Sequence, residues 1–496
     1  MCNRTQAEIG NKLRTAIKLS ILAVTLLFGI SSNAAIIYDK AHSPYYLNST
    51  LTIAEHDTLI ILEGTTIFID IEVDIIVYGT MLIKGTIDEP ASILPKVDTI
   101  GWGRIYLYKP GANCRFDHVK IVDGTVLSKD ANLIYRNVHF INRQNLPLHF
   151  NVTRIERAEV DLQNCSIEGI GKGEGFLLMS VSNAVIRNCS FDNIPDAVEI
   201  TMVTNSRICN NFFNNIPDDA IDLNNCTSVI VDSNTIIYAH DRGIEIGSEI
   251  FGSSTDITLR RNLLVGCKEA IVFKEGSSGL ITNNTLYQNE IGIVCKEIGP
   301  TPGGSWVTVE NTILSQSVSG DIETDSLSEV VINYSLSDTE VLDGFANLYE
   351  DPEFTDPEND DFTLQESSPC IDAGNPYSLP DPDKTTSDIG AYFFNQDTTT
   401  SLITYRSTIE SVNIYPNPFA SLLNIEYHLH NQTNVKVELY NTSGIKVRTI
   451  ANHSQIGGDY KIEANFKEGK PIEVGFYICV ISFDNVVKGF KAMHIK

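Results

Sequence analysis

Apolar and polar residues alternate along most of the chain, in short runs that are separated by turn residues. The run AIDLN at 220–224 alternates strictly, and a period of two is typical of a β-strand with one buried face. Similar runs are FLLMS at 176–180, AVEIT at 197–201, GIEIG at 243–247 and AIVFK at 270–274. We find no sustained helical spacing, so the pattern predicts an all-β protein.

The strands belong to a repeat that can be aligned on one column. This column contains Cys165, Cys189, Asn211, Asn234, Asn262, Asn284 and Asn311. A period near 23 residues with short strands predicts one coil of a parallel β-helix per repeat. Coils of this kind stack about 4.8 Å apart, so the asparagine amides are expected to bond one another from coil to coil.

The cysteines also follow the repeat. Of ten cysteines, nine remain if Cys2 leaves with a signal peptide, and an odd number cannot all pair. Cys165 and Cys189 share the inward column, where we expect small buried hydrophobic side chains. A disulfide bridge between these two stays open.

This repeat resembles the right-handed parallel β-helix superfamily of pectate lyases, polygalacturonases and chondroitinase B-type lyases. The resemblance covers roughly residues 45–340. The stretch from DPEFTDPEND to DIGAY, residues 351–392, looks like the segment that ends many exported bacterial β-helix proteins. The resemblance therefore implies a solenoid domain over 45–392. It is less specific for activity, because one fold hosts many functions.

The last part of the chain has a different pattern. VNIYPNPFASLLNIEYHL and GFYICVISFDNVVKGFKAMHIK lie in residues 412–496, after a polar linker at 393–411. Regular strand spacing predicts a small β-sandwich. The two stretches closely resemble the C-terminal sorting domain of the type IX secretion system of Bacteroidetes, and a carbohydrate-binding module is the other interpretation. The resemblance implies the type IX secretion machinery as a partner, with residues after about 411 removed or exchanged at the cell surface.

The first residues are predicted to form a secretory signal peptide, residues 1–35. Three basic residues precede an apolar run at 19–30, and the small residues Ala34 and Ala35 mark the cleavage region. No other segment is apolar enough to span a bilayer. We therefore expect a protein that is secreted or at the cell surface, with no transmembrane segment after signal cleavage.

The net charge limits the partners. With 63 acidic and 36 basic residues the net charge is −27, which opposes binding to nucleic acid. An acidic polysaccharide would also be repelled in general. It could bind only through a local basic patch or a bridging cation.

Carboxylates gather around one strand of the repeat. The alignment predicts one outward column of Leu178, Glu199, Asp222, Glu245, Val272 and Val294, and a second of Ser180, Thr201, Asn224, Gly247, Lys274 and Lys296. The turn before this strand carries Asp196, then Asp218 and Asp219, then Asp241 and Arg242, then Lys268 and Glu269. We expect Asp196, Asp218, Asp219, Asp222 and Glu245 to lie on one exposed face, in a shallow groove beside Arg242 and Lys274.

The order PDAVEI, PDDAIDL, HDRGIEIGS and AIVFK resembles the catalytic order of polygalacturonases. The resemblance implies that Asp196, Asp218 and Asp219 are catalytic acids of an inverting glycoside hydrolase and that Lys274 binds uronate. Arg242 replaces the family histidine and Val272 the family arginine, so galacturonan specificity does not carry over. Groups on neighbouring coils are about 5 Å apart, and groups two coils apart are about 10 Å apart. These distances bracket the separation of the two carboxyl groups that inverting hydrolysis needs.

Two other interpretations stay open. Glu199, Asp222 and Glu245 offer the hard oxygen ligands that Ca²⁺ prefers, and the related lyases imply a uronate bridged by the ion with Lys274 or Lys296 as base. No cofactor other than Ca²⁺ is suggested. In the third interpretation the charges keep a long sheet soluble, and the protein binds polysaccharide or displays a surface without catalysis. The sequence predicts a candidate site without deciding whether it is enzymatic.

Overall fold

The computed structural model describes residues 34–98, 101–109, 111–143, 151–297, 299, 303–396, 409–429, 433–441, 446–455, 458–467, 471–483 and 486–495. The predicted signal peptide, apart from its last two residues, and most of the predicted linker lie outside these ranges. Within them, no helix is long and apolar enough to cross a membrane.

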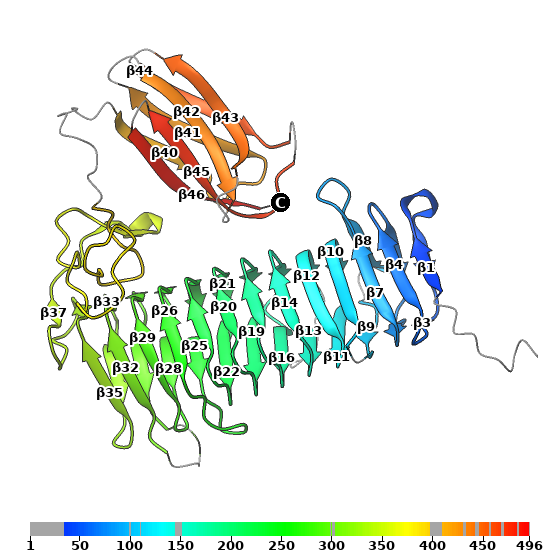
Figure 1. Cartoon of the computed structure of the whole chain (residues 1–496), viewed down its shortest axis with the longest axis horizontal. Coiled ribbons are helices and arrows are strands. Elements are labelled where there is room, and N and C mark those ends of the chain that lie inside the picture. Colours follow the sequence, from blue (N-terminus) through cyan, green and yellow to red (C-terminus); the bar gives the residue numbers. More distant parts are fainter. Residues whose placement is uncertain are drawn as a thin grey trace, which may run out of the picture.

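The main domain is a parallel β-solenoid with three faces, followed by a separate antiparallel domain (Figure 1). The alternating sequence forms strands because each coil buries one side of every strand in the solenoid and pairs its backbone with the coils on either side. The prediction of an all-β solenoid with a small β-sandwich is confirmed.

The first face pairs its strands in parallel from coil to coil. Its strands are β1 (Ala35–Tyr38), β4 (Thr58–Leu62), β7 (Thr80–Lys84), the first half of β10 (Asn113–Val122), the first half of β12 (Asn132–Ile141), β14 (Val160–Gln163), β17 (Val185–Arg187), β20 (Arg207–Cys209), β23 (Ile230–Asp232), β26 (Ile257–Arg260), β29 (Ser278–Thr282), β32 (Trp306–Glu310) and β35 (Glu329–Asn333). The coils thus begin at Ala35, before residue 45.

The second face follows the first directly in each coil. It contains β2 (Tyr45–Leu47), β5 (Thr66–Ile69), β8 (Ala91–Pro95), the second halves of β10 and β12, β15 (Ser166–Glu168), β18 (Ser190–Asp192), β21 (Phe212–Ile216), β24 (Thr235–Ala239), β27 (Leu263–Val265), β30 (Thr285–Tyr287), β33 (Ile313–Ser315), β36 (Leu336–Ser337) and β37 (Leu348–Tyr349). A short 3-10 helix, η1 (Lys40–His42), lies between β1 and β2.

The third face is a separate sheet of 12 parallel strands. In order they are β3 (Leu51–Ile53), β6 (Ile75–Val77), β9 (Arg104–Leu107), β11 (Thr125–Lys129), β13 (Asn151–Glu156), β16 (Glu174–Met179), β19 (Val198–Thr201), β22 (Ile221–Asn224), β25 (Arg242–Ile246), β28 (Glu269–Phe273), β31 (Ile291–Cys295) and β34 (Gly320–Thr324). This face carries the acidic strands of the predicted site.

The asparagine ladder forms between the first two faces, as predicted. The side-chain amide of Asn211 donates to Asn234 at 3.0 Å, Asn234 to Asn262 at 3.0 Å, and Asn262 to Asn284 at 2.9 Å. The predicted last rung, Asn311, is wrong by one residue. The backbone N–H of Asn284 donates to the Thr312 hydroxyl instead.

The interior of the solenoid is apolar, and stacked rings such as Phe191 and Phe213, 4.8 Å apart, continue from coil to coil. Cys165 and Cys189 lie in the ladder column, and both are free and buried. The proposed bridge between them is therefore not formed. Their role as small buried side chains explains why the column accepts either cysteine or asparagine.

The segment after β37 folds against the solenoid. It contains β38 (Phe354–Asp356), the 3-10 helix η2 (Pro357–Asn359) and β39 (Asp361–Leu364). Phe354 and Phe362 pack edge-on against Tyr287, which points outward from the second face. The segment therefore covers the side of the last coils.

The C-terminal domain is a two-sheet antiparallel sandwich with its own apolar core. One sheet contains β40 (Ile409–Tyr415), β41 (Leu422–Leu429) and β44 (Gly458–Asn465), and the other β43 (Lys446–Gln455), β42 (Thr433–Asn441), β45 (Gly475–Phe483) and β46 (Val486–His494). Its first strand begins within the predicted linker, at Ile409.

Candidate functional site

The candidate site lies on the outer side of the third face, across β19, β22 and β25. The strand register places Leu177, Glu199, Asp222, Glu245, Val272 and Val294 in one outward column. The predicted Leu178 and Ser180 are each wrong by one position, and Leu177 and Met179 take their places. The acidic part of the column is as predicted.

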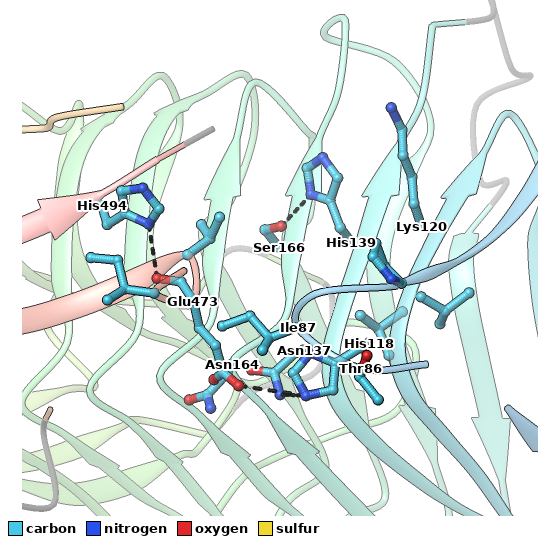
Figure 2. A pocket seen from close by; sticks show the side chains of 15 residues that line it. Thr86, Ile87, His118, Lys120, Asn137, His139, Asn164, Ser166, Glu473 and His494 are labelled. Atoms are coloured by element: carbon cyan, nitrogen blue, oxygen red, sulfur yellow. Dashed lines mark hydrogen bonds and ion pairs between the residues drawn. The ribbon is translucent and has the colours of Figure 1, made fainter. Parts of the chain in front are cut away.

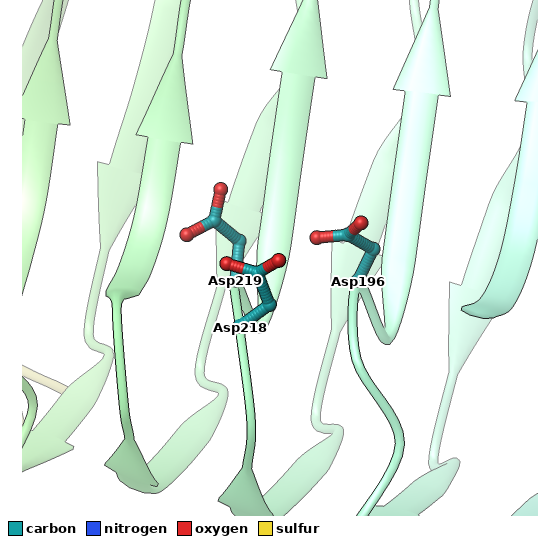
Figure 3. A group of neighbouring side chains, drawn as sticks. All are labelled: Asp196, Asp218 and Asp219. Atoms are coloured by element: carbon teal, nitrogen blue, oxygen red, sulfur yellow. The ribbon is translucent and has the colours of Figure 1, made fainter. Parts of the chain in front are cut away.

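Three aspartates converge where the chain enters these strands. Asp196 precedes β19, and Asp218 and Asp219 precede β22 on the next coil (Figure 3). One carboxylate oxygen from each of the three lies within 4.8 Å of the others. The parallel pairing fixes this arrangement, because the N–H of Ala197 donates to the carbonyl of Asp219 at 3.1 Å.

The acids differ strongly in exposure. Asp218 is exposed, whereas Asp219 is only 6% exposed and Glu245 only 4%. The prediction that all five acids lie on an exposed face is therefore wrong for these two. The reason is that Arg242 and Lys274 lie over them and form ion pairs with Glu245.

Burial and crowding keep several of these carboxyls protonated. Burial and the charges of Asp218 and Glu174 raise the pKa of Asp196 to about 7. The pKa of Asp219 is also raised, first by burial and then by its hydrogen bond to Glu245. Burial and the charge of Glu245 raise the pKa of Asp222. The carboxyls of this cluster therefore keep their protons to higher pH than isolated aspartates do.

Glu245 is the ionised member of the cluster. Burial opposes its charge, but hydrogen bonds from Asp219 and Lys274 and the charges of Lys274 and Arg242 lower its pKa. Asp222 has a hydrogen-bond partner for only one of its two carboxylate oxygens. Its Oδ2 accepts from Asn224 at 2.6 Å, while its buried Oδ1 has no hydrogen-bond partner. This orphaned oxygen points to a proton, a water or a cation that completes the site.

The basic neighbours are already engaged by carboxylates. Arg242 contacts Asp219 at 3.7 Å, Asp241 at 3.4 Å and Glu269 at 3.3 Å, in addition to Glu245. Lys274 pairs with Glu245, and Lys296 pairs with Glu323 at 2.9 Å and lies 3.7 Å from Glu269. These three cations neutralise acids, which reduces their capacity to bind a uronate.

Sequence reasoning missed one acid of this site. Glu174, one coil before Asp196, is buried and contributes to its raised pKa. It occupies the same turn column as Asp196 and Asp219, so extending the alignment by one earlier coil finds it. Glu269, which the sequence places in this turn, pairs with Arg242.

The carboxylates fit a hard cation. Asp196, Asp218 and Asp219 supply oxygen ligands only, and their convergence within 4.8 Å suits Ca²⁺. This trio differs from the predicted ligands Glu199, Asp222 and Glu245, of which Glu245 is occupied by two cations. A metal at this position would replace the protons that Asp196 and Asp219 otherwise hold.

A second hollow lies between the second face and the C-terminal sandwich (Figure 2). His118, Lys120 and His139 line it from the solenoid, and Glu473 and His494 from the sandwich. His118 approaches Glu473 at 3.5 Å. This contact joins the two domains and lies away from the acids of the third face.

Two family models match the sequence. The right-handed β-helix region matches residues 110–249 and 149–312, and the secretion system C-terminal sorting domain matches residues 413–494. No curated protein matches the chain in sequence.

Among solved structures, the catalytic domain of a GH87 α-1,3-glucanase in complex with tetrasaccharides is 11% identical, with 61% of this chain and 69% of that chain covered and a TM-score of 0.36. The periplasmic alginate epimerase AlgG is 12% identical, with coverages of 61% and 84% and a TM-score of 0.32. A PL6 family polysaccharide lyase from Pseudopedobacter saltans, Pedsa3628, is 12% identical, with coverages of 68% and 97% and a TM-score of 0.28.

The matched families account for both folded parts of the chain. The solenoid matches along its central coils, and the sandwich matches over nearly its whole length. The protein is a right-handed parallel β-helix protein with a type IX secretion C-terminal sorting domain, which marks it for export to the cell surface or beyond.

Proposed function

We propose that the third face binds and hydrolyses a polysaccharide, with Asp196 as general acid and Asp218 as its partner carboxylate. The observation that carries the proposal is a carboxyl with a pKa of about 7 beside an exposed carboxylate on the next coil. Glycosidases need such a pair, one group protonated and the other ionised. Burial and the charge of Asp241 also raise the pKa of Asp218, but Asp196 is the more deeply buried of the two, which favours Asp196 as the protonated member.

The separation of the carboxylates favours retention over inversion. Oxygens of Asp196 and Asp218 lie within 4.8 Å, close to the about 5–5.5 Å of retaining enzymes and short of the about 6.5–9.5 Å of inverting ones. The resemblance to polygalacturonases implied inversion, and the coil spacing was compatible with it, but the convergence of these side chains across adjacent coils favours retention. In this arrangement Asp218 attacks the anomeric carbon while Asp196 protonates the leaving oxygen.

The test is a panel of neutral and acidic polysaccharides incubated with the purified chain. New reducing ends without absorbance of unsaturated uronate are expected, and Asp196→Asn and Asp218→Asn should each lower the rate at least about 100-fold. Lys268→Gln, an exposed residue paired with Asp241, is the matched control and should remain active. Glycan binding without any product would instead place the protein in the non-catalytic class.

A calcium-dependent lyase is the second candidate, and the convergence of Asp196, Asp218 and Asp219 favours it. Bound Ca²⁺ would neutralise the carboxylate of a uronate substrate. The predicted bases, Lys274 and Lys296, are both ion-paired with glutamates, so each amine must leave its partner before it can reach a substrate proton. Unsaturated product that disappears with a chelator would select this mechanism over hydrolysis.

A further inference from the structure

Four arginines gather on the first face of the solenoid, in a chain whose net charge is −27. Arg187, Arg207 and Arg260 belong to β17, β20 and β26, and Arg261 follows β26. Together with Asp232 of β23 they form what we call the arginine cluster. Parallel pairing aligns Arg187, Cys209, Asp232 and Arg260 in one column.

One buried carboxylate holds three of these side chains. Asp232, whose side chain is 1% exposed, accepts hydrogen bonds from Arg207 and, at 3.0 Å each, from Arg260 and Arg261. Burial opposes its charge, yet the arginines lower its pKa. A single negative charge leaves this group with an excess of two positive charges, and Arg187, bonded to the neutral Gln163, adds a third.

The excess charge faces solvent. The side chains of Arg207 and Arg261 are 46% and 50% exposed, and that of Arg260 is 33% exposed. Each guanidinium has five N–H donors, and Asp232 uses only one or two from each. Asp232 therefore fixes the orientation of three guanidiniums. The Nε of Arg260 is buried, so the donors that can reach a ligand are the solvent-exposed ones, chiefly those of Arg207 and Arg261.

The cluster has a defined length along the solenoid. Arg187 and Arg260 are three coils apart, which corresponds to about 14 Å. Beyond Arg260 the same column continues with Thr282 and then Glu310. Before Arg187 it continues with the neutral Gln163 and then with Arg136, which is paired with a carboxylate of its own. Neutralising one buried carboxylate requires one guanidinium, and the additional arginines exceed what the fold needs.

We propose that the arginine cluster is a binding site for an anionic polysaccharide, separate from the acidic site of the third face. Carboxylate or sulfate groups on successive sugar residues would meet guanidiniums on successive coils, and planar Arg pairs with such groups through two parallel hydrogen bonds. A nucleic acid fits less well, because its charge continues past the short basic stretch into acidic surface. The site holds an exported protein on a glycan while the third face stays free.

The experiment measures binding of polygalacturonate, a sulfated polysaccharide and a neutral glucan to the full chain by calorimetry. Binding of the two anionic probes, weakened by salt, is expected. The double variant Arg207→Gln/Arg261→Gln should weaken it about tenfold or more. Arg157→Gln removes an arginine of similar exposure that pairs with Asp130 elsewhere on the solenoid, and should leave binding unchanged. The carboxylated and sulfated probes show which anion is preferred.

Several results would overturn the proposal. One is that the double variant binds the anionic probes as tightly as the wild type, and another is that Arg157→Gln loses as much affinity as the double variant. A third is that the neutral glucan or duplex DNA binds the wild type as tightly as the anionic polysaccharides do. If the double variant does not fold, Arg261→Gln alone gives the same comparison. Asp218→Asn should retain binding of the anionic probes, so failure of the hydrolytic proposal and failure of this one are distinguishable.

Discussion

The third and first faces build opposite electrostatic sites from the same stacked architecture. On the third face Asp196, Asp219 and Asp222 crowd together and their pKa values are raised. On the first face Asp232 is just as deeply buried, but three arginines surround it and its pKa is lowered. Burial alone therefore does not decide the charge of a carboxyl in this solenoid. The number of cations stacked on adjacent coils decides it.

The largest difference between the faces should appear when each buried acid is replaced by its neutral isostere. We expect Asp232→Asn to lower the free energy of unfolding by about 2–3 kcal/mol, because three guanidiniums lose their counter-charge and are themselves partly exposed. Asp222→Asn should change it by less than about 1 kcal/mol, since burial and the charge of Glu245 disfavour a charge on this side chain and the amide carries none. Denaturant unfolding at pH 7 compares the two variants. Equal losses in the free energy of unfolding would contradict the proposed difference between the two faces.

The pH dependence of stability should also separate the two faces. The pKa of Asp196 is about 7 in the folded chain and 3.8 in the unfolded reference. The folded state therefore binds more protons, and its stability falls as pH rises from about 3.8 to about 7. Asp196→Asn should remove up to about 4 kcal/mol of this fall, because each pKa unit corresponds to about 1.4 kcal/mol. The pKa of Asp232 is lowered in the folded chain. Its carboxylate therefore stabilises the fold at neutral pH, and this contribution should be lost only as pH falls below about 3.8.

Thermal unfolding between pH 2 and 8 measures both slopes. The matched control is Asp232→Asn, which should leave the decline between pH 4 and 7 in place. A wild type whose stability is flat over this range would show that Asp196 is ionised throughout.

Calcium should stabilise the third face and leave the first unaffected. At a Ca²⁺ concentration ten times Kd, binding to the native state adds about 1.4 kcal/mol. Asp218→Asn removes one of three converging ligands and should abolish most of the resulting rise in Tm. Arg261→Gln should keep it. A rise that persists in Asp218→Asn would place the ion elsewhere.

The sequence predicted the fold well because every coil repeats the same buried strand positions and most coils repeat the same ladder residue. The ladder of Asn211, Asn234 and Asn262 follows from the repeat alone. The alignment failed at Asn311 because that residue takes a left-handed turn conformation, with φ at 49°, just before the rung. Leu178 was misplaced because Leu177, which does point outward, is also apolar, and a slip of one residue exchanges the two faces of a strand.

The candidate site was predicted only in part. Column positions follow from the alignment, but the burial of Asp219 and Glu245 depends on where Arg242 and Lys274 place their long side chains. The arginine cluster was missed although its signal was present. Two residues before each ladder position the sequence has Arg187, Cys209, Asp232 and Arg260, a column whose charges predict the cluster.

The pKa of Asp196 tests most directly whether this residue can be the general acid of the third face. Difference potentiometric titration of the wild type and Asp196→Asn isolates the protons bound at this carboxyl, and Asp232→Asn provides the control from the first face. We expect a group that titrates near pH 7 to be missing in Asp196→Asn and retained in Asp232→Asn. If the group that Asp196→Asn lacks instead titrates below pH 5 in the wild type, Asp196 is ionised at neutral pH. It could then not act as a general acid, which would contradict the proposed hydrolysis.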